Sequence, residues 1–176
     1  MHKYINVDYD KQYLLELYQK SKKIVSKNIF IDATIPEIAQ DPEISALFDK
    51  FSFIPPVYHS VALTMLTKEM KPYINPGCNG LIILPIQASL ELSFYSYPGE
   101  IIDGRPTLNP TYDRSLVPTI QETLTETVIT DRPIMINGLV THSYKPNPAD
   151  LPELPLMLIF KIPSNFTWDE ATSFVE

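Results

Sequence analysis

Residues 71–97, KPYINPGCNGLIILPIQASLELSFYSY, decide the fold, because two apolar runs flank a short polar link in them. The first run, residues 81–86, is apolar throughout, which indicates a strand buried on both faces. The second run, residues 90–97, places leucine and phenylalanine alternately with polar residues or tyrosine, which is typical of a half-buried strand. The stretch therefore predicts two paired strands, approached through a turn-rich segment at 72–77.

Two helices are expected before these strands. Apolar residues recur at helical spacing over residues 11–25, after Asp10, whose carboxylate can cap a helix. Lysines gather toward the end of this segment, where the helix dipole favours cations. A second start signal is Asp41-Pro42-Glu43, which combines a cap, a proline at the first helical position and an acid in the first turn.

The rest of the chain reads as short strands separated by turn formers. Besides the central pair, the expected strands are residues 3–7, 58–66, 119–130, 134–137, 139–144 and 156–162. Thr167 is expected to cap one short helix near the end of the chain. About seven or eight short strands preceded by helices fit a mainly β fold, a β-sandwich or jelly roll with helices packed outside.

The length of 176 residues is sufficient for a substantial core, and a single domain over residues 1–176 is expected. Within it, residues 1–55 form a helical N-terminal part, residues 56–163 the jelly-roll core and residues 164–176 a tail. The sequence contains no internal repeat and no linker that would divide the chain.

Composition excludes several classes of function. The net charge of −7 disfavours binding to nucleic acid or to an anionic membrane surface, since both reward clustered lysine and arginine. The one cysteine, Cys78, excludes an internal disulfide. No apolar run is long enough to span a bilayer and no signal peptide is recognisable, so a soluble cytoplasmic protein is expected.

Local motifs for chemistry are sparse. The three histidines, His2, His59 and His142, form no His-x-His or His-x-Asp pair of the kind that binds metals. His142 is the best single candidate because it ends a predicted strand after a glycine, although a histidine hydrogen-bonded at a strand end explains it more simply. Cys78 has no lysine or histidine near it in sequence to lower the pKa of its thiol.

The order of elements nevertheless carries a resemblance. A run Leu-Pro-Ile around Pro85 is followed by a strand that ends in Phe94-Tyr95, and later by an aspartate turn, the strand 134–137 and His142. Over residues 60–162 this order resembles the double-stranded β-helix, a cupin-like jelly roll, of Fe(II)/2-oxoglutarate-dependent oxygenases. The likeness is to the small hydroxylase-like proteins of bacteria and phages in particular.

In that family, a His-x-Asp pair before the strand proline and a distal histidine form a facial triad that binds iron. With Pro85 on the family's proline, Tyr73 stands in place of the first histidine and Asn75 in place of the aspartate. His142 takes the place of the distal histidine. The basic residue that would pair with the 2-oxoglutarate carboxylate is missing from the start of the last strand, where Lys161 comes late.

The resemblance therefore implies a retained scaffold with a degenerate metal site and no cofactor. A tyrosine binds Fe(II) poorly unless it ionises, which requires a large shift from a pKa of about 10. An asparagine lacks the charge of a carboxylate. In a different alignment of this loop, ligands come from Asp103, Asp113 or His59 instead, and then Fe(II) and 2-oxoglutarate are the expected cofactors.

Three functions follow from these alternatives. The first is a non-catalytic domain that binds a small molecule or a protein side chain in a pocket lined by Tyr73, Asn75, Asn137 and His142, with Tyr95 deeper inside. The second is an active Fe(II)/2-oxoglutarate-dependent hydroxylase with an atypical triad. The third is a metal-free cupin-type enzyme in which His142 and Tyr73 act as acid and base. Exposed strand edges are also compatible with a homodimer.

Overall fold

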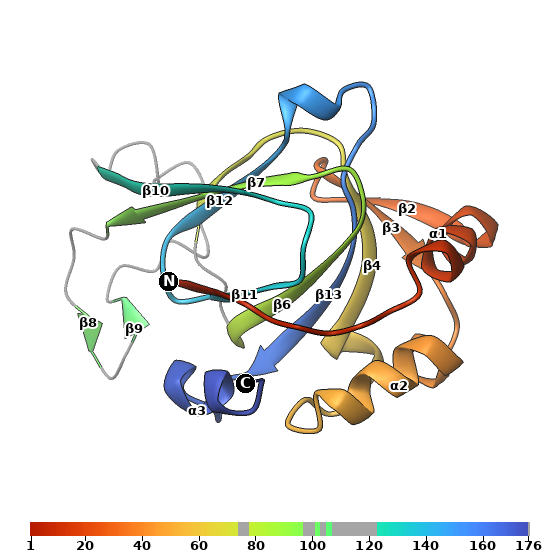
Figure 1. Cartoon of the computed structure of the whole chain (residues 1–176), viewed down its shortest axis with the longest axis horizontal. Helices are drawn as coiled ribbons and strands as arrows, with labels where there is room; N and C mark the ends of the chain where they lie inside the picture. Colours follow the sequence, from red (N-terminus) through yellow and green to blue (C-terminus); the bar gives the residue numbers. More distant parts are fainter. Residues whose placement is uncertain (74–77, 97–100, 103–104, 107–122, 176) are drawn as a thin grey trace.

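The structure, a computed structural model, describes residues 1–73, 78–96, 101–102, 105–106 and 123–175 (Figure 1). This part of the chain is mainly β, as expected, and its strands form two large antiparallel sheets. A separate hairpin pairs β8 (Ile101–Ile102) with β9 (Arg105–Pro106).

The larger sheet has seven strands in the order β1-β11-β6-β13-β4-β3-β2. Their bounds are β1 His2–Tyr4, β11 Ile134–Asn137, β6 Cys78–Gln87, β13 Leu156–Pro163, β4 Val61–Leu66, β3 Phe30–Thr34 and β2 Lys22–Ser26. The longest strands, β6 and β13, pair with each other at the centre of the sheet, while β1 and β2 are its two edges.

The smaller sheet has four strands in the order β10-β7-β12-β5. Their bounds are β10 Thr123–Thr130, β7 Leu90–Ser96, β12 His142–Pro146 and β5 Met70–Tyr73. One hydrophobic cluster contains side chains from both sheets and therefore lies between them. Leu90, Leu92 and Phe94 of β7 belong to it, which confirms the predicted half-buried strand.

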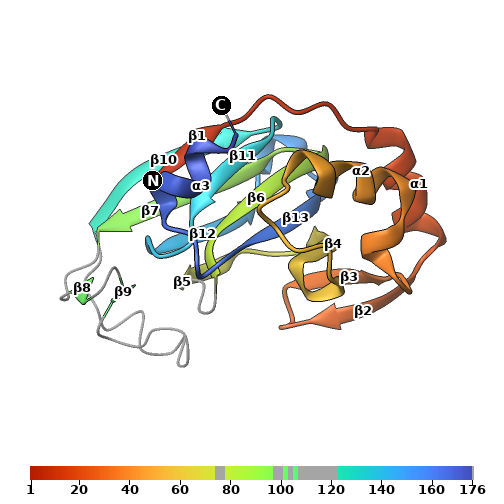
Figure 2. The same ribbon diagram turned by 90° about the horizontal axis from the view of Figure 1, so that it is seen from below.

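A second hydrophobic cluster joins the opposite face of the larger sheet to the helices. The helices are α1 (Lys11–Lys20), α2 (Pro42–Lys50) and α3 (Trp168–Ser173), with 3₁₀ turns at Ile38–Gln40, Tyr58–Ser60 and Pro148–Asp150. In this layer, the ring of Phe48 in α2 packs edge-on against Phe160 of β13 at 5.0 Å. Figure 2 shows the helices beside the larger sheet. No helix among the described residues is long and apolar enough to cross a membrane.

Strand β6 contributes to both clusters because its side chains alternate between the faces of the sheet. Leu81 and Ile83 face the smaller sheet, and Ile82 and Leu84 face the helices. All four are at most 5% exposed, so the prediction of a strand buried on both faces is confirmed. Gly80 of β6 lies tightly against β11, because a Cβ at this position would be 2.8 Å from the backbone oxygen of Ile136.

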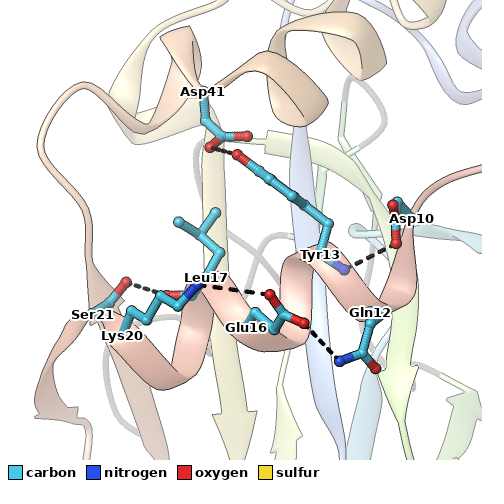
Figure 3. A network of polar contacts seen from close by, with 8 residues as sticks. All are labelled: Asp10, Gln12, Tyr13, Glu16, Leu17, Lys20, Ser21 and Asp41. Atoms are coloured by element: carbon cyan, nitrogen blue, oxygen red, sulfur yellow. Dashed lines mark hydrogen bonds and ion pairs between the residues drawn. The ribbon is translucent and has the colours of Figure 1, made fainter.

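The first helix is shorter than predicted, and the prediction of a helix over residues 11–25 is wrong in its last turn. Asp10 caps α1 by accepting a hydrogen bond from the backbone N–H of Tyr13 at 2.9 Å (Figure 3). The helix ends at Lys20, Ser21 is extended, and residues 22–26 form β2. Ile24 and Val25, which were expected on the buried face of the helix, are 58% and 69% exposed. Both are β-branched, which favours the strand that they form with β3.

The other helix signals are confirmed. The Asp41 carboxylate accepts hydrogen bonds from the N–H groups of Glu43 and Ile44 at the start of α2. Thr167 and Glu170 form a capping box at the start of α3.

Strand bounds differ from the prediction mainly where a turn intervenes. The strand expected over 139–144 begins only at His142, because the Asn137 side chain accepts from the N–H of Leu139 and holds the chain in a turn. Residues 58–60 form a 3₁₀ turn before β4, and residues 119–122 of the expected strand lie outside the described part.

Candidate functional site

Two of the predicted site residues come together across the smaller sheet. Tyr73 of β5 and His142 of β12 are directly paired, and their ring centroids lie 4.7 Å apart. Tyr144 joins them from the same face of β12, with its ring 5.3 Å from that of His142. The hydroxyl of Tyr73 donates to the hydroxyl of Tyr144 at 3.3 Å. These three residues are called the aromatic cluster below.

The aromatic cluster lies inside the molecule, between the two sheets. His142 is 0% exposed, Tyr144 3% and Tyr73 9%. His142 is paired with Phe94 of β7, and Tyr144 with Leu92, so apolar side chains continue the cluster along the sheet. The ring of His2 in β1 stacks on Phe94 at 5.5 Å and covers it from the edge of the larger sheet.

Burial determines the protonation of His142. Removal from water lowers the pKa of its imidazole to about 4, against a smaller opposing effect of a hydrogen bond to the backbone oxygen of Val140. The ring is therefore neutral at pH 7. Nδ1 lies 2.6 Å from the Val140 oxygen, so Nδ1 carries the proton and donates it, and the lone pair is on Nε2.

The remaining predicted residues are not in the aromatic cluster. Tyr95 alternates with Phe94 and points to the outer face of β7, where its hydroxyl lies 3.1 Å from that of Ser143. This corrects the expectation that Tyr95 lies deeper in the pocket. Asn137 caps the turn after β11, and strand alternation puts it on the face of Met135, toward the helices.

The structure describes the position of only one of the other residues proposed as metal ligands. Asn75, Asp103 and Asp113 lie outside the described residues. His59 is exposed in the 3₁₀ turn Tyr58–Ser60, where its ring packs against that of Tyr58.

The donor atoms of the aromatic cluster do not fit an iron site of the facial-triad type. Such a site takes two imidazoles and one carboxylate, whereas the cluster offers one imidazole and two phenols. In the described ranges, no three histidine, cysteine, aspartate or glutamate side chains group as metal ligands do. The Tyr73 hydroxyl is already hydrogen-bonded to that of Tyr144.

Sequence reasoning missed Tyr144 and two surface hollows. Tyr144 is two residues from His142 in a strand, so a period of two would have placed both on one face. One hollow, of about 300 Å³, lies between the segment after β1, α2 and the end of α3. The other, of about 460 Å³, lies between the residues around Glu37 and the run Pro56-Val57-Tyr58, in which Tyr58 is 77% exposed. The run Pro55-Pro56-Val57-Tyr58 was the sequence signal for it.

Comparison with known proteins gives distant likenesses to solved structures. No protein-family model matches the chain, and no curated protein matches its sequence. A chain in the crystal structure of Drosophila melanogaster CENP-C bound to CAL1 is 8% identical, with 85% of this chain and 90% of that chain covered and a TM-score of 0.40. The non-haem α-ketoglutarate-dependent epimerase SnoN from nogalamycin biosynthesis is 10% identical, with 92% and 78% covered and a TM-score of 0.45. At TM-scores below 0.5, neither likeness bears on the function of this chain.

Proposed function

We propose that the protein is a non-catalytic binding domain on a single-domain jelly-roll scaffold of the oxygenase type, without an iron site. Its ligand would be a small molecule or a protein side chain. The aromatic cluster supports the part of the proposal that concerns iron: where the resemblance expects metal ligands, Tyr73 and His142 pack against each other in the core.

The protonation of His142 also disfavours the metal-free enzyme. A general acid or base is most effective when its pKa lies near the working pH. With a pKa of about 4, only about one His142 in a thousand is protonated at pH 7, and the neutral ring is a weak base. Its 0% exposure leaves no surface on the ring for a substrate to approach.

The test is an anaerobic titration of the metal-free protein with Fe(II) and 2-oxoglutarate, followed by visible absorption. We expect no saturable charge-transfer band, because the cluster supplies one imidazole and no carboxylate. A saturable band would overturn the proposal and make the hydroxylase the leading function.

The matched control is His142→Leu. A band that is seen in the wild type and lost in this variant would assign the iron to His142. A band retained in the variant would assign the iron to other ligands. Either result contradicts a domain without an iron site.

A further inference from the structure

Strand β2 is an open edge of the larger sheet. It is the last strand in the sheet order, and its one strand neighbour is β3, paired from Lys22 opposite Thr34 to Ser26 opposite Phe30. Successive peptide groups of a strand point to opposite sides, so about half of those in β2 point away from β3. Among the described residues no strand pairs with that side.

The side chains of this edge are apolar and basic. Ile24 and Val25 are 58% and 69% exposed, and, as neighbours in a strand, they lie on opposite faces of the sheet. The segment 20–27 holds four lysines, at positions 20, 22, 23 and 27, and no acidic residue. Lys20 pairs with Glu16 at 3.7 Å, and Asp32 stands opposite Ile24 in β3, so four lysines and two carboxylates leave this edge with a charge of +2 in a chain whose net charge is −7.

Strand β2 is already ordered in the free chain, by the turn that follows it and by the attachment of β3 to α1. The turn after β2 places Lys27 and Asn28 at φ values of 53° and 56°, in the left-handed region, and returns the chain directly into β3. From the other side, the Tyr18 hydroxyl of α1 donates to the backbone oxygen of Ile31 in β3 at 3.0 Å. A strand that is already ordered loses little conformational entropy on pairing, which favours binding.

We propose that β2 binds an extended, acidic segment of a partner protein, which adds to the larger sheet as a further antiparallel or parallel strand. Backbone hydrogen bonds to β2 would hold the segment, Ile24 and Val25 would pack against its side chains, and the lysines would pair with its carboxylates. Charge complementarity favours such a partner over a second copy of this chain, because a second β2 would bring four more lysines to the same edge.

This inference goes beyond the proposed function, because β2 shares no residue with the aromatic cluster. The two proposals are tested by different titrations and can fail separately.

The experiment uses two synthetic peptides of seven residues with blocked termini. In the first, glutamate alternates with valine, and in the second, lysine replaces glutamate. Each is titrated into the ¹⁵N-labelled full chain while the amide resonances of residues 22–26 are followed. We expect saturable shifts in this segment with the acidic peptide only, and binding weakened roughly tenfold in 0.5 M salt.

A charge-reversed variant makes the test specific. Lys22→Glu combined with Lys23→Glu should lose the acidic peptide and gain the lysine peptide, whereas Lys161→Glu, a charge reversal at an exposed position of β13, should bind as the wild type does. Both positions of the double variant are exposed, and the free-state spectrum reports whether the β2–β3 hairpin is retained.

Three results would overturn the proposal. The first is the absence of shifts in residues 22–26 at about 1 mM acidic peptide. The second is equal binding of the two peptides. The third is shifts in this segment that depend on protein concentration without peptide, which would assign the edge to a second copy of the chain.

Discussion

At the scale of single residues, the burial of His142 links the core to pH. Its pKa is about 4 in the folded protein and close to 6.5 in an unfolded chain. Between these values the unfolded chain binds a proton that the folded protein does not, so acid favours unfolding. Stability is therefore unaffected by this group above about pH 6.5 and falls as the pH drops toward 4, by roughly 3 kcal/mol at most.

The corresponding prediction concerns His142→Leu. The free energy of unfolding of the wild type should fall between pH 7 and pH 4.5 by roughly 2–3 kcal/mol more than that of the variant, because leucine removes the titrating group. Urea unfolding at both pH values measures the difference.

His59→Leu serves as the matched control, because it makes the same substitution at an exposed histidine outside the core. If His142→Leu fails to fold, NMR titration of the His142 ring in the wild type gives the same answer. An imidazole that titrates near pH 6.5 would contradict the assignment.

The residue scale also shows how much of the site the sequence could predict. Tyr73 and His142 are 69 positions apart, and only the placement of Pro85 on a family pattern suggested that they meet. The position of Tyr95 was predictable, because it alternates with Phe94 and must face the other side of β7. The pKa of His142 was not, since it depends on residues that the fold brings around the ring.

At the scale of elements, Asp41 joins two helices. One carboxylate oxygen caps α2, and the other accepts from the hydroxyl of Tyr13 in α1 at 2.7 Å (Figure 3). The same hydrogen bond raises the pKa of Tyr13 above its ordinary value. Asp41 is therefore one of the polar links between α1 and α2, beside the hydrogen bond from the backbone N–H of Asp10 to the Glu43 carboxylate.

We predict that Asp41→Ala lowers the free energy of unfolding by about 1–2 kcal/mol, because the first N–H groups of α2 lose their acceptor. Tyr13→Phe removes only the link to α1 and should cost less than about 1 kcal/mol. Urea unfolding at pH 7 compares the two variants. Equal losses in both would mean that the link between the helices, rather than the cap, carries the effect.

Element starts were easier to predict than element ends. Asp41-Pro42-Glu43 and Thr167 mark helix starts by local hydrogen bonds that the sequence displays directly. The end of α1 has no such local signal. It is set by the pairing of residues 22–26 with β3, and a contact between two segments is not visible in the sequence of either one. The start of β12 was misplaced because Asn137 holds a turn that the alternation of the next residues conceals.

At the scale of the whole molecule, the larger sheet lies between the two hydrophobic clusters and contributes side chains to both. The helices cover one of its faces and the smaller sheet covers the other. Its central strands β6 and β13 are buried along most of their length, whereas β2 is exposed at nearly every position.

Hydrogen exchange should follow this arrangement. Amides of β6 and β13 should exchange slowest, by roughly two or more orders of magnitude relative to β2, because opening them exposes both clusters. Exchange measured by NMR at pH 7 tests the prediction. Comparable rates in β6 and β2 would contradict it, because the centre of the sheet would then open as readily as its edge.

The close approach at Gly80 has a consequence for how the strands choose their partners. A strand that alternates between polar and apolar residues finds its alignment because a slip of one position would bury its polar side. Residues 81–86 are apolar on both sides and carry no such information. If β6 slipped by one residue, Asn79 or Leu81 would take the position of Gly80. A Cβ at that position would lie only 2.8 Å from the backbone oxygen of Ile136 and would clash with it. The absence of a side chain at Gly80 thus fixes the register of this strand, which the alternation of polar and apolar residues fixes in other strands.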